Sequence, residues 1–500
     1  MSGKKEHAIS PSRAENYSGW YGRVIRVADL AEHSPVRGCM VIKPNGYALW
    51  ENIRTILDAR LKATGHRNAY FPLFIPLSYL QREADHVEGF AKECAVVTHH
   101  KLVKDGTGAL RPDGLLEEPL VVRPTSETMI GEMFAKWITS YRDLPLLINQ
   151  WCNIVRWEMR TRLFLRTTEF LWQEGHTAHA TAEEAMEEAR TILDLYVNFI
   201  ENELAIPVIK GEKTEKERFP GAVNTFTFEM MMQDGKALQG GTSHFLGRNF
   251  AKATNITFQS AKGTDEYAWT TSWGVTTRLI GGLIMVHGDD DGLILPPAVA
   301  PLHVVVIPVI HKEETKEEIL AYCRTLRDKV CTLSYRDRPV ECLIDDKGER
   351  SGEKVWSAIK RGIPVRVEIG IREVTTGTVS VGIRTLPPKE RVVQSREEFT
   401  ETLPSRLTEI RSTLFRRAEE ARDALLFHLH SEKELYDFFS SSGKGFVYAY
   451  YAQDPAIEER IGNDLGVTVR CIPFDNNEES GTCIFTGKQN AGRALFAKAY

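Results

Sequence analysis

The segment LLINQWCNIVRWEMRTRLFLRTTEFLWQ, residues 146–173, decides the fold. Its first part, residues 146–158, and its last part, residues 166–173, are rich in the apolar and aromatic residues that favour strands. The loop MRTRLFL separates the two parts, and this arrangement predicts an antiparallel hairpin. Side chains alternate between the two faces of a strand, so two arginines, one acid and two aromatic rings can converge on one surface. These five residues are Arg156, Glu158, Arg166, Phe170 and Trp172.

The chain before the hairpin predicts a helix followed by an interrupted strand. Apolar residues recur every three or four positions over residues 45–65, where Asn45 is placed to cap the helix and Gly65 to end it. The aromatic run over residues 68–75 carries Pro72, which cannot donate to a sheet ladder. We therefore expect this strand at a sheet edge or at a subunit contact.

The chain after the hairpin continues to mix helices and strands. In order, we expect a helix over residues 182–204, a polar loop over 210–218, a strand over 222–232 and a glycine-rich segment over 238–247. Trp273 and Gly274 then open an apolar helix that runs to about His287 and carries Arg278 near its start.

The C-terminal half predicts two smaller units. A strand begins at His303, and strands and helices alternate from there to Arg384, which is typical of an α/β domain. After Pro387 and Pro388, a long helix with apolar residues at three-and-four spacing leads to short strands and turns. We therefore predict three domains, over residues 1–300, 301–400 and 401–500.

Composition restricts the classes of protein to which the chain can belong. A length of 500 residues, with 42% hydrophobic and 26% charged residues, is typical of a folded multidomain protein. The formal charge of -5 excludes nucleic-acid binding through global positive charge, so any such surface must be local. The eight cysteines form no CxxC pair, the N-terminus lacks an apolar signal region, and no window is apolar enough to span a membrane. We expect a cytoplasmic protein with reduced cysteines and no membrane association.

Several common phosphate-binding and catalytic motifs do not occur. The sequence contains no GxxxxGK[ST], GxGxxG, HExxH or GxSxG pattern. His176 and His179 form the nearest histidine pair, and without an evident third ligand they favour a cavity wall over a zinc site. An arginine-rich antiparallel surface offers a different nucleotide site, in which guanidinium groups bind phosphates bidentately and an aromatic ring supports adenine.

Three segments carry a resemblance to a known superfamily. The helix and interrupted strand around Pro72, the hairpin over residues 156–170 and the helix that carries Arg278 resemble motifs 1, 2 and 3 of class II aminoacyl-tRNA synthetases, in that order. Five further segments look like prolyl-tRNA synthetase of the archaeal and eukaryotic type, and the likeness covers nearly the whole chain. They are RPTSE (residues 123–127), WQEGHTAH (172–179), FPGA (219–222), GGTSHFLGRNFAK (240–252) and SWGVTTRLIGGLIMVHGDD (272–290).

The resemblance implies a fold and an activity. The fold would be an α+β class II catalytic domain with an antiparallel sheet, followed by an α/β anticodon-binding domain and a small α/β C-terminal domain. The activity would be ATP-dependent attachment of L-proline to tRNA(Pro) through a prolyl-adenylate. Motif 1 builds the dimer interface in this superfamily, so a homodimer around Pro72 is also implied.

The resemblance also assigns roles to residues of the nucleotide site. Arg156 and Arg278 would be the catalytic pair: Arg156 touches the prolyl carboxylate and the α-phosphate, and Arg278 covers the adenine and meets the γ-phosphate. Glu158 would accept from the adenine amino group and Phe170 would stack below the ring. The other ATP-binding residues would be Arg166, Thr167, Gln239 and Thr242. Magnesium would arrive with ATP, coordinated by phosphates and hard oxygen ligands.

Proline needs a partner for its secondary ammonium and flat walls for its ring. By resemblance, Thr125 and Glu127 bind the nitrogen, Arg156 binds the carboxylate, and five residues form the pocket. These five are Trp172, His176, Phe219, His244 and Ser272. Structural roles stay open at this stage, because Thr125 and Ser126 could cap a helix that runs to Trp137. Likewise, Phe219 and His176 could be core residues, and Arg156 with Glu158 could be a surface ion pair.

The anticodon-binding domain is expected to contact tRNA through Lys354, Arg366 and Arg372, although the chain departs from its relatives here. Ala358 and Ile359 stand where the relatives usually carry an aromatic residue and an acid, which leaves the mode of anticodon reading open.

Two further departures concern zinc and editing. Many relatives hold zinc with four cysteines in the C-terminal domain, whereas the matching segments here keep only Cys483, so we predict no zinc and no other protein-bound metal. The segment between Arg166 and Arg278 is too short for the editing domain of bacterial-type relatives. We therefore expect no hydrolysis of mischarged alanine and some misactivation of alanine and cysteine.

Two other functions compete with proline–tRNA ligation. A threonyl or other class IIa specificity is disfavoured by the TSE and WQEGH segments. A synthetase-like binding or regulatory protein without catalysis is expected to lose the phosphate-binding arginines, yet Arg156, Arg166 and Arg278 all remain.

Overall fold

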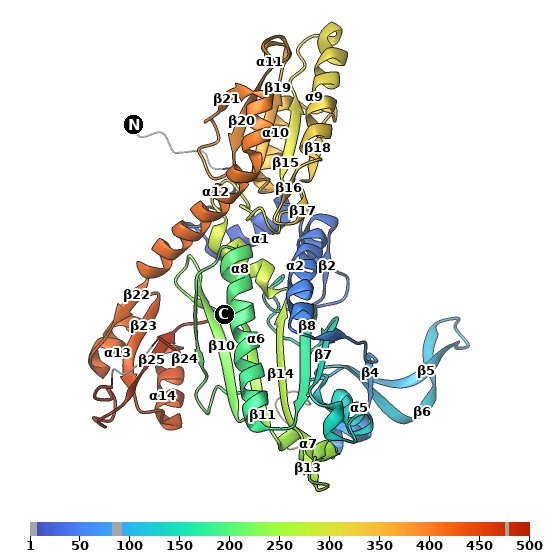
Figure 1. Cartoon of the computed structure of the whole chain (residues 1–500), viewed down its shortest axis with the longest axis vertical. Helices are drawn as coiled ribbons and strands as arrows, with labels where there is room; N and C mark the ends of the chain where they lie inside the picture. Colours follow the sequence, from blue (N-terminus) through green and yellow to red (C-terminus); the bar gives the residue numbers. More distant parts are fainter. Residues whose placement is uncertain (1–7, 83–92, 476–479) are drawn as a thin grey trace.

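A computed structural model describes residues 8–82, 93–475 and 480–500 of the chain. It has a large body built on one long sheet and a separate five-stranded unit, which stands at the top of Figure 1. Helix α12 (Arg396–Asp423) runs diagonally from that unit to the C-terminal strands and helices at the lower left. The molecule is therefore elongated, and this long helix connects the five-stranded unit to the C-terminal strands and helices.

The long sheet contains 11 strands and determines where the cavity described below lies. In spatial order they are β22 (Leu426–His428), β23 (Phe446–Tyr451), β25 (Gly492–Ala497), β24 (Thr468–Pro473), β9 (Val208–Glu212), β10 (Asn224–Met231), β11 (Ala237–Gly247), β14 (Trp269–Thr276), β8 (Glu169–His179), β7 (Leu146–Val155) and β3 (Arg67–Asn68). The C-terminal strands join the others where Ile472 of β24 pairs with Glu212 of β9. The sequence did not indicate this continuity, and the predicted domain limits remain a prediction.

The hairpin predicted from residues 146–173 is present as β7 and β8, antiparallel from Leu146 opposite Ala178 to Val155 opposite Glu169. The strands end earlier than predicted, so Arg156 and Arg166 lie in the connection between them and not on strand faces. The reason is local: the connection closes on itself through reciprocal backbone hydrogen bonds between Arg162 and Arg166.

Two predictions beyond the hairpin were wrong in part. Trp273 and Gly274 lie inside β14, because this strand pairs with both β8 and β11, and helix α8 (Arg278–His287) begins only after it. The segment predicted as a polar loop over residues 210–218 begins with the end of β9, which pairs with β10 on one side and β24 on the other. In both cases a neighbouring strand supplies backbone partners that the local sequence does not reveal.

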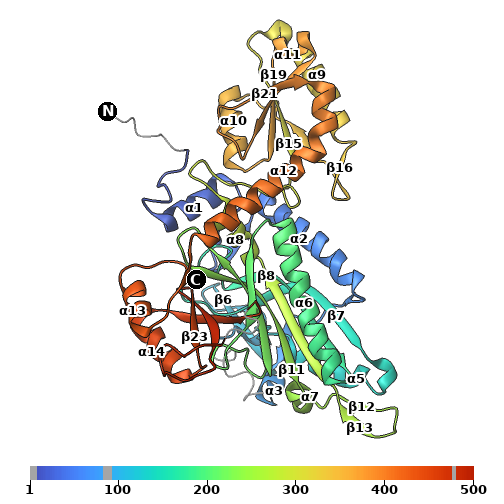
Figure 2. The ribbon, with the colours of Figure 1, turned by 60° about the vertical axis from the view of Figure 1, so that its left-hand side comes forward.

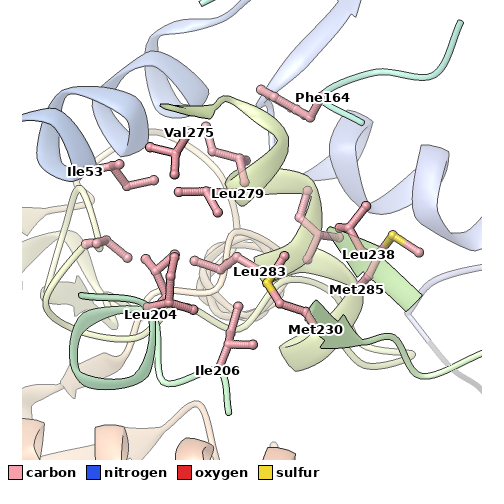
Figure 3. Packing of buried hydrophobic residues seen from close by; sticks show 14 of the residues in the cluster. Ile53, Phe164, Leu204, Ile206, Met230, Leu238, Val275, Leu279, Leu283 and Met285 are labelled. Atoms are coloured by element: carbon pink, nitrogen blue, oxygen red, sulfur yellow. The ribbon is translucent and has the colours of Figure 1, made fainter. Parts of the chain in front are cut away.

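The predicted helix after the hairpin is confirmed as α6 (Ala182–Glu203), capped by a reciprocal box between Thr181 and Glu184. It packs across β10, β11 and β14. Helix α8 is apolar nearly all round and is buried between the sheet and the N-terminal helices. Figure 3 shows Leu283 of α8 on the side of Leu204, Ile206 and Met230, and Leu279 on the side of Ile53 and Val275, all within the main core.

The region around Pro72 forms a helix but no continuous strand. The predicted helix is α2 (Pro44–Ala63); it begins with Pro44 in its first turn, so Asn45 lies inside it and is not its cap. The predicted strand is split into β3, which pairs with β7, and β4 (Phe74–Pro76), which pairs with β6 (Leu110–Val122). Pro72 falls between them, where its missing amide costs no ladder bond.

The remaining elements of the large body complete its surface. They are α1 (Tyr17–Val27), β1 (Ala31–His33), β2 (Met40–Ile42), α3 (Leu77–Arg82), β5 (Val96–Lys104), α5 (Glu127–Trp137), α7 (Asn249–Thr254), β12 (Thr257–Gln259), β13 (Asp265–Tyr267), α13 (Glu432–Ser440) and α14 (Pro455–Leu465). Strands β5 and β6 form a long hairpin that projects from the body at the right of Figure 1.

The predicted α/β unit is confirmed as a five-stranded sheet flanked by helices, seen from a second side in Figure 2. Its strands, in spatial order, are β18 (Cys342–Ile344), β15 (Val304–Pro308), β19 (Val365–Ile369), β20 (Thr378–Ile383) and β21 (Val392–Ser395). Its helices are α9 (Lys316–Val330), α10 (Ser351–Lys360) and α11 (Ile371–Thr376), and a short hairpin joins β16 (Ser334–Tyr335) to β17 (Arg338–Pro339). The predicted long helix is α12, whose apolar residues from Phe399 to Leu414 pack into the core of this unit.

Among the residues that the structure describes, no helix is both long and apolar enough to cross a bilayer.

Truncation of Leu283 to alanine is expected to lower the free energy of unfolding by about 2–5 kcal/mol, because its side chain is fully buried and leaves a cavity. The matched variant Leu343→Ala, at a half-exposed position of β18, is expected to change it by at most ~0.5 kcal/mol. Urea denaturation followed by tryptophan fluorescence compares the two. Equal losses would contradict the place of Leu283 in the core.

Candidate active site

One cavity of about 490 Å³ lies on the long sheet and is bordered by β8, β10, β11 and β14. The connection between β7 and β8 and the segment 213–220 complete its rim. All fifteen residues predicted to bind proline or ATP line it. They are Thr125, Glu127, Arg156, Glu158, Arg166, Thr167, Phe170, Trp172, His176, Phe219, Gln239, Thr242, His244, Ser272 and Arg278. The fold therefore brings together residues that are spread over more than 150 positions of the sequence.

Arg156 lies where β7 leaves the sheet. Its Nε donates to the carbonyl oxygen of Pro124 at 3.0 Å, and its guanidinium carbon lies 5.8 Å from the ring centroids of both Phe170 and Trp172. Burial lowers the pKa of Arg156, and the negative charge of Glu127 opposes this shift. The guanidinium is thus held between two aromatic rings in a cation–π arrangement.

Arg278 is the first residue of α8. Its Nε donates to the carbonyl oxygen of Leu165 at 3.1 Å, and its Nη1 lies 3.5 Å from that of Gln239. Burial, followed by the like charges of Arg166 and Arg156, lowers the pKa of Arg278 to about 10. The side chain stays charged near neutral pH, and this end of the cavity holds several cations that a polyanion would stabilise.

A buried ion pair lies at the other end of the cavity. Glu174 is 2% exposed and accepts hydrogen bonds from Ser126 Oγ (2.6 Å), Gln150 Nε2 (2.7 Å) and His176 Nε2 (2.9 Å). Burial alone would raise the pKa of Glu174, but the hydrogen bonds, first that of His176, hold it below its ordinary value. Burial would likewise lower the pKa of His176, but Glu174 raises it. The pair is therefore ionised.

Thr125 and Glu127 lie beside this pair at the start of α5. The hydroxyl of Thr125 donates to Glu127 Oε2, and burial raises the pKa of the Glu127 carboxyl. The capping interpretation of this segment does not hold for Ser126, because its hydroxyl donates to Glu174 and makes no cap bond to the helix. Thr125 and Glu127 thus offer a hydroxyl and a carboxyl group to the cavity.

Two rings form a flat wall between these ends. Phe219 stacks on His244 with ring centroids 4.5 Å apart and an interplanar angle of 28°. The two nitrogens of His244 lie 3.0 Å from the hydroxyls of Thr225 and Thr242. Burial, followed by the charge of His176, lowers the pKa of His244 to about 3, so this ring is neutral near neutral pH. The wall is uncharged and planar.

Comparison with known proteins identifies the family. A model of the tRNA synthetase class II core domain (G, H, P, S and T) matches residues 113–287, a model of the anticodon binding domain matches 303–406, and a model of the prolyl-tRNA synthetase C-terminal region matches 437–500. The proline–tRNA ligase of Rhodopirellula baltica is 56% identical over 505 residues, covering 100% of this chain and 99% of its own. The chain belongs to the prolyl-tRNA synthetase family.

Two further comparisons agree with this family. The proline–tRNA ligase of Bdellovibrio bacteriovorus is 55% identical over 497 residues, with 99% of each chain covered. The crystal structure of prolyl-tRNA synthetase from Cryptosporidium parvum complexed with L-proline and AMP matches with a TM-score of 0.88 and 35% identity. That match covers 99% of this chain and 97% of the other. The class II core, the anticodon-binding domain and the C-terminal domain of a prolyl-tRNA synthetase are therefore all present.

The residues predicted to contact tRNA occupy three different environments. Lys354 on α10 is 4% exposed and donates to the carbonyl oxygen of Asp345 at 2.9 Å. Arg366 on β19 is 2% exposed and donates to that of Pro388 at 2.8 Å. Only Arg372, on α11, is exposed. Lys354 and Arg366 thus each bind a backbone carbonyl inside the domain, and their contact with RNA stays a prediction.

Several residues of the cavity were missed by the sequence analysis. Glu174 lies inside the quoted WQEGHTAH segment, where its position between Trp172 and His176 on one strand face was a usable signal. Lys213 and Arg218 lie in the segment expected to be a polar loop, whose start pairs with β10 and β24 and whose side chains line the cavity.

The prediction of no zinc concerns the cysteine side chains, above all Cys483. Cys483 is a buried free thiol, as Cys471 is, and all eight cysteines lie in the described ranges without a disulfide. In those ranges no cluster of three or more His, Cys, Asp or Glu side chains has a metal-binding arrangement.

The ion pair between Glu174 and His176 predicts that the free energy of unfolding depends on pH. The pKa of His176 is raised above 6.5, so its contribution is complete below that pH and is lost as the pH rises through the raised value. The pKa of Glu174 is lowered from 4.5, so its contribution is present above that pH and is lost only as the pH falls through the lowered value. The pair therefore stabilises most between pH 4.5 and 6.5.

Replacement of Glu174 by glutamine should lower the melting temperature most within this window, and progressively less as the pH rises through the raised pKa of His176, above which the imidazole is neutral in both proteins. Glu187→Gln, at an exposed position of α6, should show no such trend. Thermal unfolding followed by circular dichroism measures both. A difference for Glu174→Gln that grows with rising pH would contradict the ionised pair.

Proposed function

We propose that the chain is a proline–tRNA ligase that attaches L-proline to tRNA(Pro) with ATP through a prolyl-adenylate. The observation that carries this proposal is the division of the cavity. One end holds the cations Arg166 and Arg278, the other offers Glu127, and Arg156 and a flat wall of rings lie between them. A nucleotide triphosphate and a cyclic amino acid are complementary to these two ends.

Formation of the adenylate is an in-line attack of the proline carboxylate on the α-phosphate. Two anions must approach each other, so the cation between them decides the rate. Arg156 serves this role, because it lies between the two ends of the cavity and its position is held by Pro124 and two rings. Arg278 binds the far phosphate and covers the adenine, held in place by the carbonyl of Leu165. These two residues are the catalytic pair.

The remaining ATP contacts are assigned by resemblance to the family, and all of these residues line the cavity. Glu158 accepts from the adenine amino group, and Phe170 stacks below the ring. Arg166 and Thr167 contact the triphosphate, and Gln239 and Thr242 contact the ribose and phosphates. Arg166 Nε donates to Glu158 Oε2, so the acid is oriented by a cation. Magnesium, when bound with ATP, would neutralise phosphate charge, and a hard oxygen of the rim such as that of Gln239 suits it.

The proline site uses the opposite end. Thr125 and Glu127 accept the secondary ammonium, and Arg156 binds the carboxylate. The ring of proline packs against Trp172, Phe219 and the neutral His244, while His176 and Ser272 form the floor. The Ser272 hydroxyl is buried and has no hydrogen-bond partner among the described residues, so it can turn toward a ligand.

ATP–pyrophosphate exchange with each of the twenty amino acids, without tRNA, tests the adenylate step. Exchange should be strongest with proline and weaker with alanine and cysteine, because an apolar pocket rejects smaller substrates poorly. Arg156→Ala should lower the exchange rate by at least ~100-fold, since it removes a positioned cation from the transition state. The matched variant Arg26→Ala, at an exposed position of α1, should exchange as the unaltered protein does.

Three outcomes would contradict the proposal. Exchange with threonine alone would indicate another class IIa specificity. Exchange that survives in Arg156→Ala would remove this residue from catalysis. No exchange with any amino acid would favour a synthetase-like binding or regulatory protein.

We assign the chain to the archaeal and eukaryotic type by its domain arrangement, although the two proline–tRNA ligases named above by sequence identity are bacterial. Two observations support this. The family model of the prolyl-tRNA synthetase C-terminal region matches residues 437–500. The segment between Arg166 and Arg278 consists of strands β8–β11 and β14, helices α6 and α7, and the small β12–β13 hairpin. A separate editing domain has no place there, so mischarged alanyl-tRNA is not hydrolysed in cis. We place the protein in the cytoplasm, in keeping with its free cysteines.

Transfer RNA(Pro) is the second partner. Its anticodon binds the five-stranded unit, where Arg372 on α11 is an exposed cation available for phosphate contact. The proposed domains are a catalytic domain over residues 1–300, an anticodon-binding domain over residues 301–400 and a C-terminal domain over residues 401–500.

The protein is proposed to form a homodimer around Pro72. Next to this residue Tyr70 is 74% exposed, and the projecting β5–β6 hairpin exposes Leu102, Leu110 and Leu115 by 62–74%. An apolar surface of this kind is typical of a subunit contact. The interface is therefore expected to include this hairpin and the segment around Tyr70.

Replacement of Tyr70 or Leu115 by glutamate should shift the protein from dimer to monomer, because a charge in an apolar interface loses its hydration. Sedimentation equilibrium of each variant measures the mass. Val393→Glu, on the five-stranded unit and 60% exposed, is the control that should leave the dimer unchanged. A stable, active monomer of the unaltered protein would refute the dimer.

A further inference from the structure

The wall of the cavity formed by residues 213–220 is attached to the C-terminal domain. Lys213, Glu217, Arg218, Phe219 and Pro220 all line the cavity. The strand that leads into them, β9, pairs with β24 of the C-terminal domain. The next residue along the wall, Thr214, donates its hydroxyl to Glu458 Oε2 of α14 at 2.9 Å, and both side chains are buried. The C-terminal domain therefore supports this wall from behind.

A second attachment is ionic and completely buried. Glu229, on β10, is 0% exposed and lies between two cations. One of its carboxylate oxygens accepts from Lys213 Nζ at 3.1 Å. The other accepts from both Nε (3.0 Å) and Nη2 (2.8 Å) of Arg470, which belongs to β24. Three adjacent parts of the sheet thus meet in one network of Lys213, Glu229 and Arg470.

The network lies at the nucleotide end of the cavity. Glu229 stands opposite Gln239 in the ladder between β10 and β11, where a bulge after Phe228 shifts the register. Gln239 in turn provides the carbonyl oxygen nearest to Arg278 Nη1. The charges of Arg470 and Glu229 both act on Arg278. The proline end, with Glu174 and His176, is reached from other strands.

The charges of the network do not cancel. Lys213 and Arg470 carry two positive charges, and Glu229 supplies one negative charge that they share. Burial lowers the pKa of Lys213, whereas the carboxylate of Glu229 raises it, and the two cations hold the pKa of Glu229 below its ordinary value. An excess positive charge in a buried place is costly unless an anion arrives. The triphosphate of ATP is the anion that the neighbouring Arg278 already attracts.

We propose that Lys213 is a further ATP-binding residue and that Arg470 of the C-terminal domain is the positioning residue that holds it in place through Glu229. Arg470 does not line the cavity; it occupies one oxygen of Glu229 with two donors, so the carboxylate cannot turn and Lys213 stays in the wall facing the phosphates. The C-terminal domain thereby becomes part of the nucleotide site. This inference rests on the proposed function.

Steady-state ATP–pyrophosphate exchange with proline, using the full chain without tRNA, tests the proposal. Arg470→Met and Lys213→Met should each raise the KM for ATP about 10-fold, the expected effect of losing one charged contact, and leave the KM for proline unchanged. Arg470→Lys should restore part of the loss, because it keeps the charge but loses the two-pronged contact. The double variant should be no worse than either single one, since both act on one contact.

Matched controls separate a positioning role from a structural one. Arg460→Met removes a half-exposed arginine from the same domain, on α14, and should leave both KM values unchanged. Melting temperatures are measured for every variant. If Arg470→Met raises both KM values equally, or if the KM for ATP stays normal, Arg470 only fastens the C-terminal domain and the inference is wrong.

Two experimental results are interpreted separately: a variant that does not fold, and an unaltered protein without exchange. If Arg470→Met does not fold, Arg470→Lys and Lys213→Met decide the question by the same ratio of KM values. If the unaltered protein shows no exchange with proline, the proposed function fails and this inference fails with it. Normal exchange by the unaltered protein, together with an unchanged KM for ATP in Lys213→Met, overturns the inference alone.

Discussion

The register of the central antiparallel strands is the constraint on which the cavity depends. Ser272 of β14 stands opposite His176 of β8 on one side and His244 of β11 on the other, and His244 stands opposite Thr225 of β10. Four strands therefore place four polar side chains in one row across the sheet. A slip of one residue in any of them would turn its side chain to the face covered by α6. The site therefore depends on the pairing of these strands more than on any single side-chain contact.

The electrostatics of the cavity follow from this arrangement. Cations gather at one end, where burial and mutual repulsion lower the pKa of Arg278, while the ionised pair of Glu174 and His176 occupies the other. Between them stand the neutral rings of Phe219 and His244. The two ends of the cavity therefore differ in charge: one is cationic, and the other holds an ionised pair. In the proposed reaction, the two anions would meet at Arg156.

The C-terminal region has a larger part in the site than its distance along the chain indicates. Its strands extend the catalytic sheet through the pairing of Ile472 with Glu212, and its helix α14 contacts the wall segment through Glu458. Helix α12 links it to the anticodon-binding unit, as Figure 1 shows. The position of the wall is thus set by residues that follow the anticodon-binding domain in sequence.

Local pattern and residue chemistry were sufficient to predict the hairpin of β7 and β8, the helix α6 and the α/β unit, whereas most of the predicted cavity residues came from the resemblance to the family. Periodicity reports which face of an element is apolar, and arginine, glutamate and aromatic types report what a site can bind. The sequence could not reveal that Trp273 lies in a strand, that Lys354 and Arg366 are buried, or that Arg470 reaches Glu229. Each of these depends on pairing or packing between segments far apart in the chain. The sequence by itself determined the elements and the chemistry, whereas the tertiary structure alone decided which strands are neighbours and so which charges share the cavity, because strand pairing is a non-local choice.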